Sequence, residues 1–185
     1  MRIRRFGERL RREESGFTLV ELVTVLGMFL ITVTALSYAL ISANKIEDDM
    51  NRRFASQINA RIALDKLRRE IHCASAVTPA GSSASITITL GSRCPTAAAG
   101  TTVSWCTVGT GTRYSLYRRV GGSCDNTGLK AVDYLTTATV FSYAAQSTSS
   151  LAVLSVTLPV NTNPASGRPD YNLTDDIVLR NSTRA

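Results

Sequence analysis

The sequence predicts an α+β fold in which one long N-terminal helix packs on a mostly antiparallel β-sheet. Three observations support this prediction. Residues 17–41 form an apolar run without proline. Residues 42–76 contain neither proline nor glycine, so the helix can continue through them. From residue 77 onwards the chain is rich in Ser, Thr and Gly, and it alternates polar with apolar residues, which is the period of a β-strand.

The length and the charge distribution divide the chain into parts. A chain of 185 residues is long enough for one modest globular domain and a long helix. The formal net charge is +7, but the first part alone contains six arginines and three glutamates. The basic balance of the rest is ordinary and argues only weakly for binding to nucleic acid. The parts are a leader (1–16), an apolar half of the helix (17–41), an outer half of the helix (42–76) and a β-rich domain (77–185).

The apolar run is long enough to cross a membrane. As a helix, its 25 residues would span about 37 Å, compared with about 30 Å for the hydrocarbon core. The arginine-rich leader is expected to stay in the cytoplasm, which places the later residues outside. A secretory signal peptide has a shorter apolar stretch and a small-residue cleavage site at its outer end. Here the break in composition lies at the inner end instead, at residues 15–17.

One charged residue interrupts the apolar run. Glu21 lies five residues into it, where an unpaired carboxylate is costly in lipid and is by default a functional group. A plain signal anchor with an incidental glutamate is the alternative interpretation. Such an anchor would lose nothing if Glu21 were replaced by an apolar residue, whereas a functional carboxylate could not be replaced.

The sequence GFTLVE at residues 16–21, between the basic leader and the apolar run, resembles the cleavage and methylation motif of type IV prepilins. The resemblance covers residues 11–41. It implies a pilin-like fold, and it implies that a prepilin peptidase in the membrane cuts between Gly16 and Phe17 and N-methylates Phe17. It also implies that Glu21 is the assembly glutamate. The implied partners are other pilin or pseudopilin subunits and an inner-membrane assembly platform.

The chemistry of the motif agrees with these roles. A carboxylate inside lipid or a fibre core needs a partner, and cleavage exposes a suitable amine at Phe17. Segments 66–71 and 176–181 also resemble minor pilins and J-type pseudopilins, in their general residue pattern and not in a specific motif. The sequence therefore predicts a minor pilin or pseudopilin, assembled into the fibre of a secretion, DNA-uptake or adhesion machine.

Two apolar patterns mark the outer half of the helix. At about 100° per residue, a spacing of four residues drifts around the helix, so the first pattern is expected to contact both the subunit's own sheet and fibre neighbours. The second pattern stays on one face and is expected to cover the sheet. The first, which we call the apolar stripe, consists of Ile46, Met50, Phe54, Ile58 and Ile62. The second, which we call the packing face, contains Ala60, Leu64, Leu67 and Ile71.

Four cysteines, Cys73, Cys94, Cys106 and Cys124, are separated by 20, 11 and 17 residues. None of these gaps has the short spacing of a structural zinc site. The even count downstream of a membrane segment favours disulfides formed in an oxidising space. Three connectivities are open. We prefer Cys106–Cys124, which flank a predicted hairpin, together with Cys73–Cys94, which lie at the helix end and after the first strand.

The β-rich domain contains six segments with strand patterns, separated by turn signals. Gly109-Thr110-Gly111 is predicted to be a hairpin turn, because no helix follows it as a phosphate-binding loop would require. Residues 161–170 are predicted to form an exposed loop. The predicted strands are 85–90, 102–108, 112–119, 138–143, 151–158 and 176–180.

The sequence contains no catalytic motif, and we expect neither enzyme activity nor a cofactor. The only histidine, His72, lies at the helix end and is expected to be structural. With one histidine and no suitable cysteine spacing, we expect no transition-metal site. One rival function is a pilus-tip module that binds nucleic acid or another surface by stacking bases on aromatic residues beside arginines. Its residues would be Trp105, Arg113, Tyr114, Tyr117, Arg118 and Arg119. A signal-anchored ectoenzyme is the third class.

Overall fold

The computed structural model of the chain describes residues 18–92, 94, 98, 100–167 and 169–180. These residues contain one long helix, α2 (Leu19–Cys73), and a short 3-10 helix, η1 (Pro164–Ser166). The strands are β1 (Ala74–Thr78), β2 (Gly81–Ser83), β3 (Ser85–Leu90), β4 (Thr102–Thr110), β5 (Arg113–Val120), β6 (Leu129–Leu135), β7 (Phe141–Ala144), β8 (Val153–Val160) and β9 (Tyr171–Val178).

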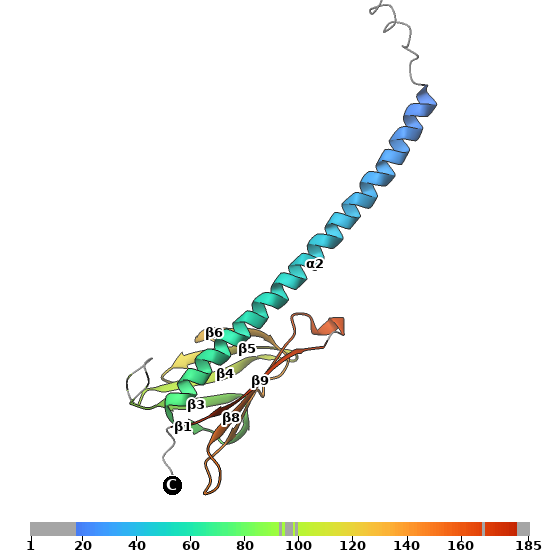
Figure 1. The fold of residues 1–185 in the computed structure, drawn as a ribbon. Helices are drawn as coiled ribbons and strands as arrows, with labels where there is room; N and C mark the ends of the chain where they lie inside the picture. The colour runs from blue at the N-terminus through green and yellow to red at the C-terminus, as the bar shows by residue number, and fades with distance from the viewer. Residues whose placement is uncertain (1–17, 93, 95–97, 99, 168, 181–185) are drawn as a thin grey trace, which may run out of the picture. The chain divides into compact units, whose positions relative to one another are not determined.

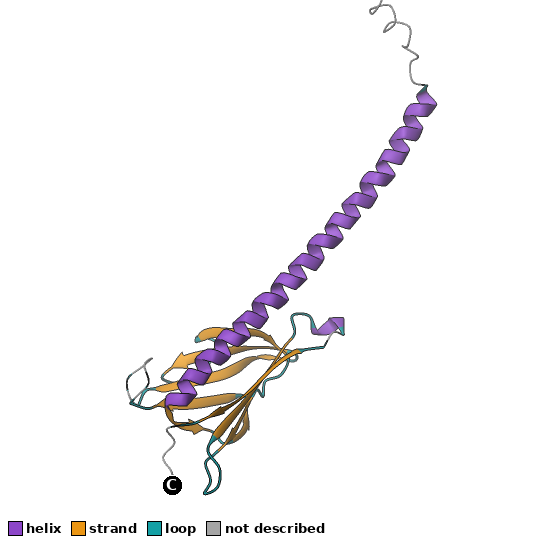
Figure 2. Cartoon of the chain, viewed as in Figure 1, coloured by secondary structure: helices purple, strands orange, loops and turns teal. Residues whose placement is uncertain are grey.

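The predicted α+β class is confirmed, because the helix packs on a curled antiparallel sheet (Figure 1). The chain divides into two units, residues 1–48 and 49–185. The second unit contains every strand together with the last part of α2, which lies along the sheet (Figure 2). The strand pairs in this sheet are all antiparallel, as the hairpin-rich sequence predicts.

The curl of the sheet follows from its strand order, which is β1-β3-β4-β5-β6-β8-β7-β2, with β9 on β8. The first and the last strand of this order, β1 and β2, are separated by only two residues of the chain. The two intervening residues leave three Cα–Cα steps, which span at most about 11 Å, so the ends of the sheet must come close to each other. The resulting concave sheet encloses the core.

The helix ends three residues earlier than predicted, at Cys73 instead of residue 76. Ala74 opens β1, which pairs with β3, and the Gly91 N–H donates to the Cys73 carbonyl at 3.0 Å. The strand pairing satisfies the backbone groups that a longer helix would have satisfied. Glycine is needed at this cap because a Cβ on Gly91 would lie 2.7 Å from the Cys73 oxygen.

All six predicted strands have a counterpart, with shifted ends. Segment 85–90 is β3 itself, and segments 102–108, 112–119, 138–143 and 151–158 correspond to β4, β5, β7 and β8. The last prediction was furthest off: segment 176–180 belongs to a strand that runs from Tyr171 to Val178. The strand starts early because it pairs with β8 along its whole length, while its polar residues point outward.

Three strands were missed. In β1 the buried residues are Ala74 and Val77, and in β6 they are Val132 and Leu135, so in each strand they are three residues apart. Register shifts along β1 and along the strand facing β6 remove the two-residue alternation that identifies a strand in a sequence. The third, β2, has only three residues and none of them is buried.

The core lies between the sheet and the packing face of α2. Ala60 and Ile71 are completely buried, and Leu64 and Leu67 are at most 5% exposed, so this face covers the sheet as predicted. Small residues at its start, Ser56 and Ala60, allow the helix to approach the strands closely. The largest fully buried side chains are Trp105, Phe141, Leu67, Ile71, Ile86, Ile88, Leu90, Leu116, Leu135, Leu154, Leu158 and Ile177.

A hairpin joins β4 and β5 as predicted, but its turn lies later than residues 109–111: Gly109 and Thr110 belong to β4, and Gly111 and Thr112 form the turn. Thr110 pairs with Arg113, and Gly111 has a φ of +62° between them. A Cβ on Gly109 would lie 2.1 Å from the Arg113 carbonyl oxygen and 2.6 Å from the Tyr114 Cα, both of which are backbone atoms.

We expect Gly109→Ala to destabilise the full-length oxidised chain by about 1–3 kcal/mol or more, because backbone must move to admit the methyl group. Gly111→Asn is the matched control: its Cβ meets open space and asparagine tolerates positive φ, so the cost should stay below about 1 kcal/mol. Urea unfolding in detergent measures both values. Equal losses for the two variants would contradict the close approach at Gly109.

Candidate functional site

The N-terminal part of α2 is apolar and exposed on all sides. Every residue from Thr18 to Ile41 is exposed in the structure, including large side chains such as Phe29 and Leu36. In the described part of the chain, this is the one helix long and apolar enough to cross a membrane, judged by length and composition. An apolar helix surface of this length needs a membrane or other protein to cover it.

Glu21 belongs to the first turn of this helix, where it forms a reciprocal cap with Thr18. The Thr18 N–H and hydroxyl donate to Glu21 Oε2 at 3.3 and 3.1 Å, and the Glu21 N–H donates to the Thr18 hydroxyl oxygen at 3.3 Å. This is the Thr-x-x-Glu capping box, which satisfies two backbone donors of the helix start. Thr18 was not singled out from the sequence, although the spacing of the two residues would have revealed it. Gly16 and Phe17 lie outside the described residues.

The apolar stripe of the outer helix half lies in solvent. Ile46, Met50, Phe54, Ile58 and Ile62 are 40–66% exposed, so the expectation that they also contact the subunit's own sheet was wrong. The geometry of the helix explains the difference. Ile58 precedes the buried Leu67 by nine residues, which is two and a half turns at about 3.6 residues per turn, so the two side chains point in opposite directions.

The same helix carries a buried ion pair that the sequence analysis did not identify. Glu70 is 1% exposed. Its Oε1 forms an ion pair with Arg118 Nη2 at 2.6 Å and accepts a hydrogen bond from Arg118 Nε at 2.8 Å, and its Oε2 accepts one from Trp105 Nε1 at 2.8 Å. Trp105 and Arg118 are direct partners across β4 and β5. Both carboxylate oxygens are therefore satisfied inside the core, as a buried charge requires.

A signal for this pair was present in the sequence. Glu70 lies three residues after Leu67 and next to Ile71, so it falls on the edge of the packing face. A carboxylate at such a position needs a cation from the sheet. The sequence offers several arginines, and nothing in their spacing distinguishes Arg118, which is selected by the strand register.

The aromatic and arginine residues of the nucleic-acid rival do not form one surface. Trp105 is completely buried, and Arg118 holds Glu70. Arg119 pairs with Asp125 and donates to the Ser123 carbonyl oxygen. Of the three arginines in this set, Arg113 is exposed, whereas Arg118 and Arg119 are half-buried. Base stacking on Trp105 would require the core to open.

The cysteines form two disulfides, Cys73–Cys94 and Cys106–Cys124, with Cα atoms 5.2 and 5.9 Å apart. This is the pairing preferred from the sequence. The first disulfide fixes the end of α2 beside the sheet, and the second closes the connection that follows β5. His72, next to the first disulfide, makes a 3.2 Å hydrogen bond between its Nδ1 and the Val178 carbonyl oxygen.

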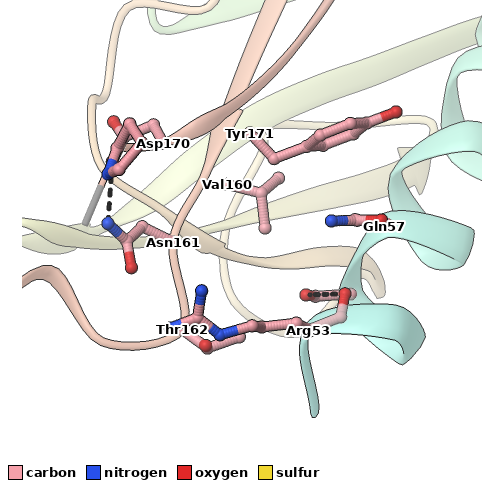
Figure 3. A pocket seen from close by; sticks show the side chains of 9 residues that line it. Arg53, Gln57, Val160, Asn161, Thr162, Asp170 and Tyr171 are labelled. Carbon is pink, nitrogen blue, oxygen red and sulfur yellow. Dashed lines mark hydrogen bonds between the residues drawn. The ribbon is translucent and has the colours of Figure 1, made fainter. Parts of the chain in front are cut away.

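A pocket of about 240 Å³ lies between the helix and the ends of β8 and β9 (Figure 3). Asp170 lines it and accepts from Asn161 Nδ2 at 2.9 Å and from the Thr136 hydroxyl at 2.6 Å. Arg53, on the helix side, pairs with Asp49 at 3.0 Å. The Thr162 hydroxyl is buried here without a hydrogen-bond partner, which a water molecule would satisfy. The charged groups of this pocket are thus already engaged.

No group of three or more His, Cys, Asp or Glu side chains is placed to hold a metal ion among the residues that the structure describes. Comparisons of the chain with protein-family models, with curated proteins and with solved structures gave no match.

The buried ion pair predicts a large and asymmetric effect of mutation. Arg118→Met should destabilise the chain by about 3–5 kcal/mol, because it leaves the Glu70 carboxylate buried without a cation. Adding Glu70→Leu should recover most of this loss, because the two apolar side chains no longer require a charge partner. Urea unfolding of the single and double variants, in detergent and under oxidising conditions, measures the coupling.

Arg68→Met is the matched control. Arg68 donates to Asp175 at 2.7 Å from a side chain that is 45% exposed, so its loss should change the unfolding midpoint little. A double variant no more stable than Arg118→Met alone would contradict the role of the buried pair.

Proposed function

We propose that the chain is a minor type IV pilin or pseudopilin, which is anchored in the cytoplasmic membrane and assembled into a pilus or pseudopilus fibre. One observation carries the proposal: helix α2 has an exposed apolar stripe opposite the face that packs on the sheet. A subunit that works alone in water gains nothing from exposing Phe54, Ile58 and Ile62 beside its globular domain. A fibre subunit needs such a second face to pack against neighbouring helices.

The first turn of the helix supports the same proposal. In this function a prepilin peptidase cuts between Gly16 and Phe17, Phe17 is N-methylated, and its amine pairs with Glu21. Thr18 already donates two hydrogen bonds to Glu21, which lowers the cost of carrying the carboxylate in an apolar environment. A hydrogen-bonded carboxylate still lacks a counter-charge, and the new amine supplies one.

The remaining parts of the proposal follow from these two sites. The leader faces the cytoplasm, residues 17–41 cross the membrane, and the disulfide-bonded domain lies outside, where disulfides form readily. The partners are the peptidase, other pilin or pseudopilin subunits and an inner-membrane assembly platform. The chain itself is not an enzyme in this proposal. A nucleic-acid-binding tip module is the weaker candidate, because Trp105 and Arg118 are engaged in the core.

Processing and the role of Glu21 can be tested together. Mass spectrometry of purified fibres should show a chain that starts at methylated Phe17, and an intact Met1 terminus would contradict the proposal. Glu21→Leu should insert into the membrane but be recovered in sheared fibres at least several-fold less than wild type, because the Phe17 amine loses its carboxylate partner. Glu21→Gln should be intermediate, since its amide still accepts a hydrogen bond. Equal recovery of wild type and Glu21→Leu would favour the plain anchor.

The apolar stripe gives a second prediction. Phe54→Ser removes an apolar side chain that is 66% exposed, so the unfolding midpoint should change little while recovery in fibres falls severalfold. Leu129→Ser is the matched control, because Leu129 is 61% exposed but lies on β6 and outside the stripe. Each value is set against the membrane pool of the same variant. Equal recovery of the two variants would remove the stripe from the assembly surface.

A further inference from the structure

A second pocket, of about 280 Å³, opens on the other flank of the helix from the pocket in Figure 3. Ser56 lines both pockets and separates them. The second one lies between α2 and β6, and its polar groups come from Arg52 and Asn59 on the helix and from Lys130 and Asp133 on the strand. Arg52 and Asn59 are seven residues apart, about two turns, so they lie on the same side of the helix.

The charges of this pocket do not cancel. Lys130 Nζ pairs with Asp133 Oδ2 at 2.8 Å, whereas Arg52 makes no ion pair with any residue that the structure describes. Burial raises the pKa of Asp133, but hydrogen bonds from Lys130, from the Ser115 hydroxyl and from the Tyr134 N–H outweigh it and bring the pKa below its ordinary value. Asp133 is therefore ionised at neutral pH, and with Arg52 and Lys130 the pocket carries one net positive charge.

The wall of the pocket is held in a strained conformation. Tyr134 has a φ of +62°, which is rare for a bulky residue and strains the backbone. Its N–H donates to Asp133 Oδ1 at 2.9 Å, and its carbonyl oxygen accepts from the Asn161 N–H at 2.9 Å. Residues held in strained backbone conformations by hydrogen bonds cluster at binding sites, where the strain prearranges the groups that contact a ligand.

We propose that this pocket binds a single carboxylate group, the side chain of a Glu or Asp residue of a neighbouring subunit. Arg52 is the unpaired cation that receives it, Asn59 offers an amide donor, and Lys130 adds a second positive charge. The net charge matches a monoanion, while Asp133 disfavours a doubly charged phosphate.

The source of the carboxylate rests on the proposed fibre function, whereas its binding does not. The test of binding therefore uses the unassembled full-length chain in detergent. Phenylglyoxal modifies accessible arginines, and mass spectrometry follows the rate at Arg52. The probe is Nα-acetylglutamate α-amide, which carries one carboxylate, and the neutral glutamine analogue is its control. At 50 mM probe we expect modification of Arg52 to slow about sixfold, as for a Kd of about 10 mM.

Two controls distinguish binding in the pocket from a general effect of the probe on arginine modification. Arg113 is exposed in a hairpin far along the chain from the pocket, and its rate should not change. Asn59→Ala, which alters an exposed residue, should keep the unfolding midpoint and lose most of the protection at Arg52. Equal protection of Arg52 and Arg113, equal protection by the glutamine analogue, or stronger protection by inorganic phosphate would each overturn the carboxylate site.

A separate measurement tests the source of the ligand. If a neighbouring subunit supplies the carboxylate, Arg52→Gln should lower recovery in fibres severalfold without changing membrane insertion. Normal recovery of Arg52→Gln beside a defective Glu21→Leu would leave the fibre function standing and overturn the neighbouring subunit as the source. Failure of both the wild type and Arg52→Gln to enter fibres would instead count against the proposed function.

Discussion

The structure of the outer domain depends on the burial of one helix face against a curled sheet. An isolated helix segment of this length is marginal in water, and a sheet with an uncovered concave face would expose its core. Packing of Leu64, Leu67 and Ile71 stabilises the helix and covers the concave face of the sheet, because the three side chains are almost completely buried. The Cys73–Cys94 disulfide and the turn from Cys73 into β1 then fix where the helix ends. Once the helix is held there, the side chains of its part in the second unit, residues 49–73, have defined directions relative to the sheet.

The fixed orientation of this helix segment determines which stripe residues point away from the sheet. Residues at four-residue spacing wind slowly around a helix, so a stripe can begin beside a packed face and end far from it. Here Phe54, Ile58 and Ile62 lie away from the sheet. The polar flank between the two faces carries Arg52 and Asn59, which line the pocket beside β6. One helix thus presents a surface used within the subunit, an apolar surface left open, and a charged flank between them.

The parts of the structure that depend on local patterns were predictable, and the parts that depend on register were not. The helix, the packing face and the existence of a hairpin between β4 and β5 follow from spacing and turn chemistry, whereas the exact turn residues do not. The strands β1 and β6 were not predicted, because register shifts place their buried residues three positions apart instead of two. The partner of Glu70 was not predicted for a related reason. Arg118 contacts Glu70 because the pairing of β4 with β5 places Arg118 opposite Trp105. The pocket at Arg52 likewise needs the strained Tyr134, which no local sequence pattern indicates.

Two glutamates on the same helix show what distinguishes a structural charge from one that needs another molecule. Glu70 finds an arginine and an indole N–H within its own chain, so its burial is balanced by groups that fold together with it. Among the residues that the structure describes, Glu21 finds only the hydroxyl and N–H of Thr18, which are neutral donors from its own helix turn. Neutral donors reduce the cost of a carboxylate in an apolar environment but do not cancel its charge. Among the described residues Glu21 has no cationic partner, and the proposed function would supply one, either from the terminus that cleavage creates or from another subunit.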